Sequence, residues 1–288
     1  MNNMQFNCGK FELLRYGKNE ELKMNTMYFT ADNNIVEEKE VLRDLGISMN
    51  NKATFDEHIS KVCQKVKQKA GWILRTFKTR NPNIMKHLWK QLVQPHVDYC
   101  SQLYMPTDGS KLSEIENLQR NFSSKIPSVR HLDYWSRLHH LQLLSQQRRL
   151  ERYRIIYVWK ILEGLVPNCG VETNYHERLG RMCQIPELKK KAPASIKKLR
   201  ENSFQVQGPK LFNSLPIKIR NLRNCSVDQF KAELDMMLEK IPDEPNVTGS
   251  NYTPSACDLY TGKPSNSIVD QIRSVNFSSK NQVRRMGQ

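Results

Sequence analysis

The clearest pattern along the chain is a helical spacing of apolar residues that begins after residue 54. Apolar or small side chains recur at intervals of three and four from Phe55 to Phe77, which predicts an amphipathic helix of about six turns. Thr54 and Glu57 form a T-x-x-E pattern, which is typical of a capping box at a helix N-terminus. Pro82 lies just beyond the predicted end, so the helix is expected to stop before it.

The same spacing predicts five more helices. They begin near Asn83, cover about 110–126, contain Leu138 and Leu141, and span 145–163 and 226–240. Pro95 is expected to kink or stop the first of these, because proline lacks the backbone N–H that a helix interior needs. Gly164, with Pro167 beyond it, provides an ordinary stop for the helix that begins at 145.

Other parts of the chain lack this spacing. Segments 11–17, 25–30 and 40–49 are strand-like and are separated by turn-like residues, so a small antiparallel sheet is expected near the N-terminus. From 168 to 225 the pattern weakens, and "NSFQVQGPKLFNSLP" (202–216) predicts a short strand-like piece mixed with turns. Residues 241–288 are rich in Pro, Asn, Ser and Thr, which predicts a mostly disordered tail.

Composition favours a protein of the cell interior, nuclear or cytoplasmic. Hydrophobic residues make up 38% of the chain and the mean hydropathy is −0.66; no apolar run approaches the roughly 18 residues of a membrane span. The N-terminus lacks the basic-then-apolar pattern of a secretory signal. Seven scattered cysteines include no C-x-x-C pair, so neither a disulfide framework nor a zinc module is indicated. We expect no metal, no cofactor and no membrane partner.

The net charge is the strongest indication of a binding partner. Lys and Arg number 45 against 29 Asp and Glu, a formal net charge of +16, which argues for a polyanionic partner, nucleic acid first. Between His58 and Val97 there is no acidic residue at all. The same window holds nine bases: Lys61, Lys65, Lys67, Lys69, Arg75, Lys78, Arg80, Lys86 and Lys90. Such a surface suits a phosphate backbone and predicts salt-sensitive, sequence-tolerant binding; the alternative is a solvated basic face.

Two further basic clusters are compatible with phosphate binding as well as with an ordinary role on the protein surface. Arg148, Arg149, Arg152 and Arg154 form one, and Lys189, Lys190, Lys191, Lys197, Lys198 and Arg200 form the other. The arginines suit either phosphate contact or a helix surface with local ion pairs. The second cluster suits a nuclear-import tract, a phosphate grip or a solvated loop. Trp72, Trp89, Trp135 and Trp159 fall in helical patterns and are expected in the core. P-loop, nucleophile-elbow, H-E-x-x-H and dinucleotide motifs do not occur.

The order of several short motifs carries a resemblance. Along 4–240 the chain has "MQFNCGKFELLRYG", "YFTADNNI", "EVLRDLGISMNNKATFDEHISKV", "GWILRTF", "LWKQLVQPHVDYCSQLY", "IENLQRNFSSKI", "LDYWSRLHHLQLLSQQRRLERYRIIYVWKILEGLVP" and "SFQVQGPKLFNSLPIKIRN". This succession resembles the C-terminal part of the reverse transcriptase of LINE-type (non-LTR) retrotransposons, of the jockey-like group.

The resemblance implies a fold and a set of roles. It implies a mainly α (α+β) chain: a small antiparallel β remnant of a polymerase palm, then a thumb-like helical bundle that cradles a template–primer duplex. Lys10 matches the lysine of the family's Phe-Asn-x-x-Lys motif, and Leu45 and Gly46 match the primer-grip hairpin. The catalytic Asp–Asp turn precedes that lysine motif in the family, so Asp32, which follows it, is not a catalytic aspartate.

The expectation is therefore a polymerase-derived chain that is not an enzyme on its own and binds an RNA–DNA hybrid or duplex. The expected divisions are 1–52 (palm remnant), 53–167 (thumb-like bundle), 168–240 (basic extension with a terminal helix) and 241–288 (tail). Two alternatives remain open. One is a truncated copy of an active reverse transcriptase, and the other is a helical module co-opted for protein interaction.

Overall fold

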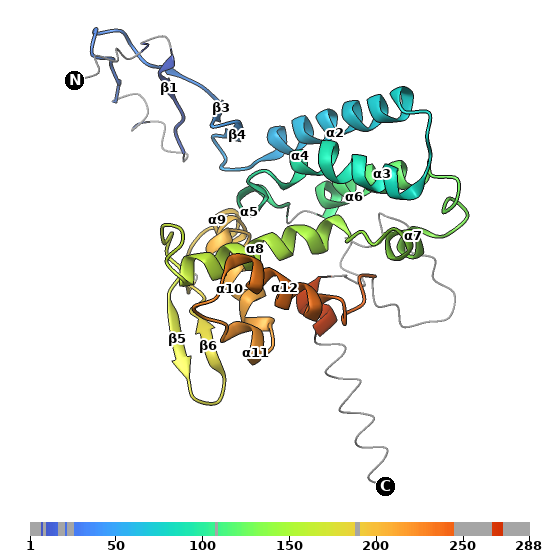
Figure 1. Cartoon of the computed structure of the whole chain (residues 1–288). Coiled ribbons are helices and arrows are strands. Elements are labelled where there is room, and N and C mark those ends of the chain that lie inside the picture. The colour runs from blue at the N-terminus through green and yellow to red at the C-terminus, as the bar shows by residue number, and fades with distance from the viewer. Residues whose placement is uncertain are drawn as a thin grey trace, which may run out of the picture. The chain divides into compact units, whose positions relative to one another are not determined.

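The computed structural model describes residues 7, 10–16, 21, 26–106, 109–187, 191–244 and 267–272. The chain forms two compact units, residues 1–64 and 65–288. Helices dominate and the strands are short (Figure 1), so the expected mainly α, α+β class is confirmed. The boundary between the units falls inside a helix, α2 (Asp56–Thr76).

The first unit contains two small strand pairs. β1 (Glu12–Leu13) pairs with β2 (Glu37–Glu38) in parallel, so the expectation of a purely antiparallel sheet is wrong for this pair. β3 (Val41–Asp44) pairs with β4 (Ile47–Asn50) antiparallel, with Asp44 opposite Ile47. A parallel pair needs a longer connection than a hairpin turn, and here 23 residues lie between Leu13 and Glu37.

The long amphipathic helix is confirmed as α2 (Asp56–Thr76). It begins slightly later than the T-x-x-E pattern suggests. The side chains of Thr54 and Glu57 both accept hydrogen bonds from one further residue, Asn50. Asn50 Nδ2 donates to Thr54 Oγ1 at 2.8 Å and to Glu57 Oε2 at 3.3 Å. The end of β4 therefore organises the start of α2.

The second unit begins its helices with α3 (Pro82–Leu88), the π-helical turn η2 (Trp89–Val93) and α4 (Gln94–Asp98), which follow one another without a break. Pro95 was expected to kink or stop the helix, and a π-helical turn precedes it instead. In this turn the Gln94 N–H donates to the Trp89 carbonyl, five residues back. A wider turn accommodates a proline without a clash with the preceding turn. Pro95 then occupies the first turn of α4, where no N–H is needed.

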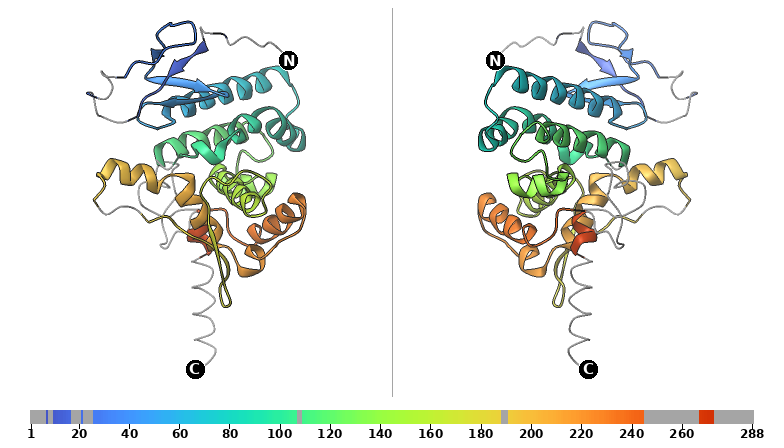
Figure 2. Two further views of the ribbon diagram at one scale, coloured as in Figure 1. Left: turned by 90° about the vertical axis from the view of Figure 1, so that its left-hand side faces the viewer. Right: turned by 90° about the vertical axis from the view of Figure 1, so that its right-hand side faces the viewer.

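The remaining elements complete the second unit. They are α5 (Ser101–Tyr104), α6 (Gly109–Ser123), α7 (Tyr134–Leu141), α8 (Gln146–Leu162), β5 (Thr173–His176), β6 (Gly180–Cys183), α9 (Ala194–Glu201), α10 (Phe204–Ser214), α11 (Ile217–Arg220) and α12 (Val227–Leu238). β5 and β6 form an antiparallel hairpin. α8 lies between α5 and α6 on one side and α10 and α12 on the other (Figures 1 and 2). It is the central helix of this unit.

The apolar core of the second unit gathers around the C-terminal half of α8. Trp159 is buried and stacks on Phe230 of α12, with ring centroids 4.5 Å apart. Phe212 of α10 and Ile268 belong to the same cluster. Buried residues of α8, β6, α10, α11, α12 and the segment around Ile268 thus share one core.

α10 is a helix where a strand-like piece with turns was expected. Gly208 and Pro209 suggested a turn, yet both are buried inside the helix. A Cβ at Gly208 would lie 2.9 Å from Val158 Cγ2 of α8, so glycine is needed there for close helix packing. Tertiary packing overrides the local preference of these two residues.

Part of the segment 241–288, which was predicted to be a mostly disordered tail, is folded. Residues 241–244 and 267–272 pack on the second unit, and Ile268 is fully buried. Residues 245–266 and 273–288 lie outside the described part of the chain. Within that part, none of the helices has the length and apolar character that crossing a membrane requires.

Candidate nucleic-acid interface

The basic residues of α2 lie apart from its buried stripe. Val66 and Ile73 are fully buried, whereas Lys65, Lys67 and Lys69 are exposed. Lys61, also exposed, precedes Lys65 by one further four-residue step on the same helix. Four residues advance a helix by about 6 Å, close to the spacing of successive phosphates along one strand of a nucleic acid.

Few carboxylates neutralise this surface. Among the described residues, none of the nine bases between His58 and Val97 makes a salt bridge of 4.0 Å or less. The positive charges of these bases affect the pKa of neighbouring groups. Burial lowers the pKa of His96 on α4, and the charges of Lys65 and Lys69 lower it further. Burial likewise lowers the pKa of Lys90, with Lys86 and Arg149 adding to the effect.

Three of the nine bases have polar partners of their own. Arg80 donates to the carbonyls of Leu74 at 2.7 Å and Thr79 at 2.8 Å, and also to that of Phe77, so it caps the C-terminal end of α2. Lys61 Nζ donates to Ser48 Oγ at 2.9 Å. Lys86 Nζ donates to Gln142 Oε1 at 3.3 Å. Arg80 is therefore held as a structural cap, while the two lysines keep donor capacity for an anion.

The other candidates on α2, α3 and η2 are accessible. Arg75 and Lys78 are exposed near the end of α2, and Lys90 is exposed on η2. Trp72, expected in the core, is 43% exposed. The Lys69 ammonium lies 5.8 Å from the centre of its ring, and Phe77 contacts the ring edge-on. An exposed aromatic ring beside lysines is a surface on which an unpaired base can stack. Trp89 and Trp159 are buried as expected, and Trp135 is partly buried.

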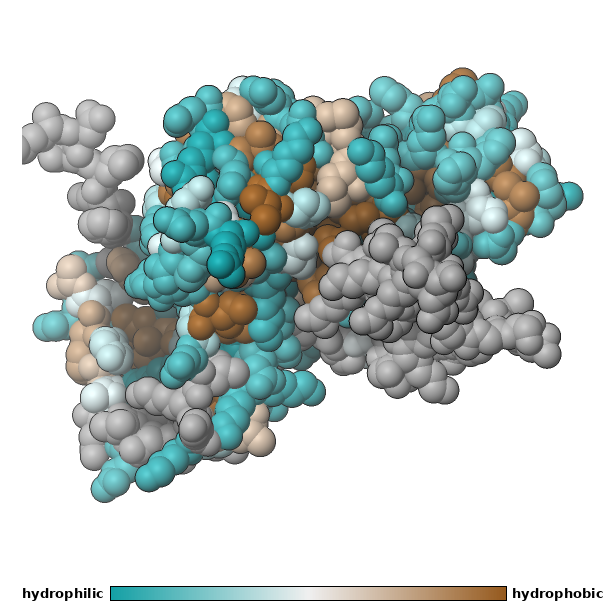
Figure 3. Space-filling model, turned by 90° about the horizontal axis from the view of Figure 1, so that it is seen from below, coloured by the Kyte–Doolittle hydropathy of each residue, from teal (hydrophilic) through white to brown (hydrophobic). Residues whose placement is uncertain are grey.

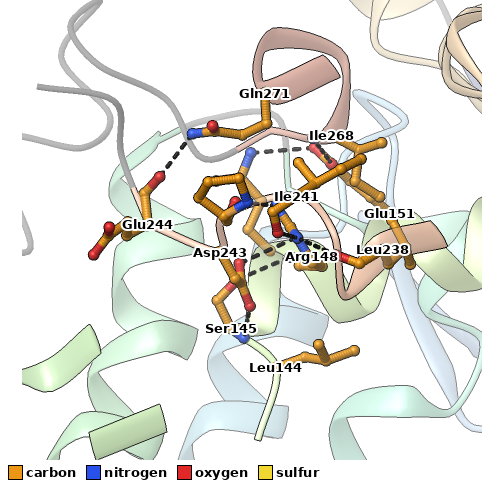
Figure 4. A network of polar contacts seen from close by, with 12 residues as sticks. Leu144, Ser145, Arg148, Glu151, Leu238, Ile241, Asp243, Glu244, Ile268 and Gln271 are labelled. Carbon is orange, nitrogen blue, oxygen red and sulfur yellow. Dashed lines mark hydrogen bonds and ion pairs between the residues drawn. The ribbon is translucent and has the colours of Figure 1, made fainter. Parts of the chain in front are cut away.

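The arginine cluster of α8 is structural. Arg149 pairs with Asp98 of α4 at 2.7 Å and Arg152 pairs with Asp235 of α12 at 2.5 Å. The buried Arg148 donates to the carbonyls of Ile241 at 2.6 Å and Pro242 at 2.5 Å and lies 3.3 Å from Asp243 (Figure 4).

Arg154 completes that cluster and is also buried. Its guanidinium donates to the carbonyls of Gln102 and Met105, and burial lowers its pKa to about 10. The structure differs from a helix surface with local ion pairs: Arg148 and Arg154 are buried, and the ion pairs of Arg148, Arg149 and Arg152 join α8 to distant residues. The four arginines fasten α8 to its neighbours, and sequence alone could not identify these partners, which lie 49 to 95 residues away along the chain.

The third basic cluster is accessible where it is described. Lys191, Lys198 and Arg200 are exposed, and α9 has no buried residue. Lys189 and Lys190 lie outside the described residues. Ile196 and Leu199 of α9 are exposed as well, so this short helix presents apolar and basic side chains together.

Comparison with known proteins adds no assignment. No protein-family model, no curated protein and no solved structure matches this chain. The geometry described above is therefore the basis for a functional proposal.

The residues selected by resemblance lie in the first unit. Leu45 and Gly46 form the tight turn between β3 and β4, with φ of 45° and 88°. Lys10 is exposed, and its N–H donates to the Asn7 carbonyl at 3.0 Å. Asp32 lies in a turn closed by a bond of 2.8 Å from the Thr30 N–H to the Asn34 carbonyl. No group of three potential metal ligands occurs in the described parts of either unit.

Proposed function

We propose that this chain binds nucleic acid through the exposed basic residues of α2, α3 and η2. The basic surface is defined by Lys61, Lys65, Lys67, Lys69, Arg75, Lys78, Lys86 and Lys90. The observation that carries the proposal is the absence of acidic residues from 59 to 96 together with the exposure of most of these bases. Lysines of this kind contact phosphates rather than base edges, so the binding is sequence-tolerant and depends on salt.

The test is fluorescence anisotropy with a labelled RNA–DNA hybrid over a series of salt concentrations. The triple variant Lys61→Gln, Lys65→Gln, Lys69→Gln removes three charges from α2 without altering its buried stripe. Each lost phosphate contact lowers the slope of log K against log salt by about 0.9 for a B-form duplex, so we expect the slope to fall by about 2 to 3. Affinity at low salt is expected to fall at least tenfold.

A matched control separates the position of the charges from their number. Lys125, Lys210 and Lys240 are exposed and lie outside the proposed surface. Changing all three to Gln alters the net charge by the same amount. An equal loss of affinity in this control, or salt-independent binding by the unaltered chain, would contradict the proposal.

We further propose that the chain is similar to the thumb and end of palm of a LINE-type reverse transcriptase, and that its activity is binding rather than catalysis. The ordered motifs from residue 4 to 240 support this proposal. A primer-extension assay with the bound hybrid tests it: the chain alone is expected to add no nucleotide. Incorporation by the purified chain would instead favour a truncated but active polymerase.

A second candidate function is a protein-interaction module, and α9 favours it. Ile196 and Leu199 are exposed beside Lys198 and Arg200. On the face viewed in Figure 3, apolar patches interrupt a mostly hydrophilic surface. Exposed apolar side chains next to basic ones fit a partner with an apolar stripe and acidic flanks. If the hybrid-binding assay is negative, an effect of Leu199→Asp on association with such a partner would support this candidate.

A further inference from the structure

The middle of α8 holds a segment that lies more than a hundred residues further along the chain. The Ile268 N–H donates to Glu151 Oε2 at 2.7 Å (Figure 4). The Ser267 side chain also hydrogen-bonds to Glu151. Glu151 is buried, so its carboxylate receives donors from the segment in place of water. Residues 267–272 are named here the C-terminal latch.

Two side chains fix the C-terminal latch in place. Ile268 is 0% exposed and belongs to the apolar cluster around Trp159. Gln271 is buried, and its Nε2 donates to the Glu244 carbonyl at 2.7 Å. The Gln271 N–H donates to the Ser267 carbonyl at 3.0 Å, which closes one helical turn. The latch is thus recognised through an aliphatic anchor, a backbone N–H and an amide side chain.

α8 holds Glu151 ready for this ligand. Gln147 Nε2 donates to Glu151 Oε1 at 3.1 Å from the preceding turn. Burial raises the pKa of Glu151, and its hydrogen bonds and the charge of Arg148 offset only part of this effect. With the latch removed, Glu151 would lose two donors, and the apolar cluster would lose a buried isoleucine side chain. Both losses carry a free-energy cost unless another ligand takes the place of the latch.

The latch cannot hold its shape by itself. Residues 268–272 form a single helical turn, and an isolated helix shorter than about 12 residues is marginal in water even with favourable residues. Its conformation therefore depends on the site, as for a peptide that folds when it binds. Its single turn of five residues, compared with the 17 residues of α8, also predicts that it opens more easily than α8 itself.

We propose that the α8 surface around Glu151 is a peptide-binding site whose resident ligand is the C-terminal latch, and that the latch opens without unfolding of the second unit. The chemistry recognised is a short peptide with a Ser–Ile start and a Gln three residues after the isoleucine. A second copy of this chain carries such a peptide. The proposal does not depend on nucleic-acid binding.

The first experiment uses the full chain with Ile268→Asp, which places a charge in the apolar anchor position and disfavours closure. A fluorescein-labelled peptide of sequence SIVDQI is titrated into it and followed by anisotropy. We expect saturable binding that unlabelled peptide displaces. A peptide with the isoleucine at its second position replaced by aspartate is expected to bind at least tenfold more weakly. The unaltered chain should also bind at least tenfold more weakly, because its own latch competes.

Asp270→Asn in the full chain is the matched control, because Asp270 lies in the same segment and is exposed; it should leave the latch closed. Circular dichroism establishes whether Ile268→Asp remains folded. A folded variant that binds no peptide, or binds the two peptides equally, would overturn the proposal.

Hydrogen exchange of the unaltered chain decides the matter independently of any variant. The amide of Ile268 is expected to exchange at least tenfold faster than the amides of Ile155 and Trp159 on α8, because the latch opens locally. Equal exchange rates would mean that the latch opens only when the whole unit unfolds, and the proposal would then fail. Excess unlabelled peptide should leave the α8 rates unchanged.

Discussion

Leu45 has a backbone conformation that leucine rarely adopts. Its φ is 45° and the following Gly46 has φ of 88°, so the β3–β4 turn has positive φ at both central positions. Turns of this kind prefer Asn–Gly, because asparagine tolerates the left-handed region and a branched apolar residue does not. The Leu45 side chain is 83% exposed, so burial does not offset this strain.

Leu45→Asn is expected to stabilise the hairpin by about 0.5 to 1 kcal/mol, since it relieves backbone strain without removing a buried side chain. Chemical unfolding followed by a probe in the first unit measures the change. Leu45→Val provides the contrast, because a β-branched residue at positive φ should destabilise the same turn. Equal stability of the two variants would show that the turn relaxes to accommodate either residue.

Trp72 is the residue best placed to distinguish stacking from phosphate contact. We expect Trp72→Ala to weaken binding to a single-stranded oligonucleotide roughly tenfold, within the 1–3 kcal/mol typical of one stacked base. The salt slope should stay constant because no charge is removed. Trp72→Phe should retain most of the affinity. If the slope falls along with the affinity, then the substitution has disturbed Lys69 rather than a stacked base.

At the scale of elements, α8 depends on buried polar contacts at its N-terminus. The Glu116 carboxylate of α6 accepts the N–H groups of Gln146 at 2.9 Å and Gln147 at 3.3 Å, and the Tyr134 hydroxyl donates to it as well. Ser145 caps the helix, and its own N–H donates to Asp243 at 2.6 Å. Orphan N–H groups and the helix dipole both favour carboxylates at this end.

Glu116 makes the stability of the second unit depend on pH. Burial raises its pKa from 4.5 to about 7, an effect that its hydrogen bonds only partly offset. The folded chain therefore keeps a proton that the unfolded chain loses, so stability falls as pH rises from about 4.5 to about 7, by about 3 kcal/mol for the full shift. Glu116→Gln should remove this part of the pH dependence. Urea unfolding at several pH values measures it, and an unchanged profile in the variant would contradict the assignment.

Arg148 is expected to be the most costly of the α8 arginines to remove. Arg148→Met retains much of the side-chain bulk but leaves the Ile241 and Pro242 carbonyls without this donor and removes the ion pair with Asp243, which keeps its hydrogen bonds from Ser145. Breaking a buried charge pair in this way costs about 3 to 5 kcal/mol. Arg200→Met on the exposed α9 should change stability by less than about 0.5 kcal/mol. Thermal unfolding of the two variants gives the comparison, and similar melting temperatures would mean that the network adds little.

At the scale of the whole molecule, the two units differ in how much apolar surface they bury. In the first unit, Met27, Tyr28, Phe29 and Ile35 are all more than half exposed, whereas the second unit has the cluster around Trp159. Since burial of apolar surface is the main source of stability, the second unit is expected to be the more stable of the two.

Calorimetry of the full chain tests this difference. If the units unfold separately, then the calorimetric enthalpy exceeds the van't Hoff enthalpy, because the transition is not two-state. We expect an excess of at least a tenth, with the first unit melting at the lower temperature. A ratio of one would show that the continuous helix α2 couples both units into one cooperative transition.

Helix positions were the part of the fold that could be predicted. α2, α6, α8 and α12 each follow an apolar spacing of three and four, and this spacing depends only on the residues of one helix. Ser145 and Ser226, the first residues of two expected helices, cap α8 and α12. α10 was missed because Gly and Pro mark turns in isolated sequence, whereas here Gly208 allows close packing on α8 and Pro209 lies inside the helix.

The sequence by itself determined the mainly helical class and the acid-free basic run that supports the proposed function. Only the tertiary structure decided which charges are accessible. Arg148 and Arg154 are buried among carbonyls, and Lys65 and Lys69 face solvent, although all four belong to basic clusters on helices. It also showed that Ile268 docks on α8. The physical reason is range: helix periodicity is local, whereas ion pairs and docking join residues whose separation along the chain leaves no pattern in the sequence.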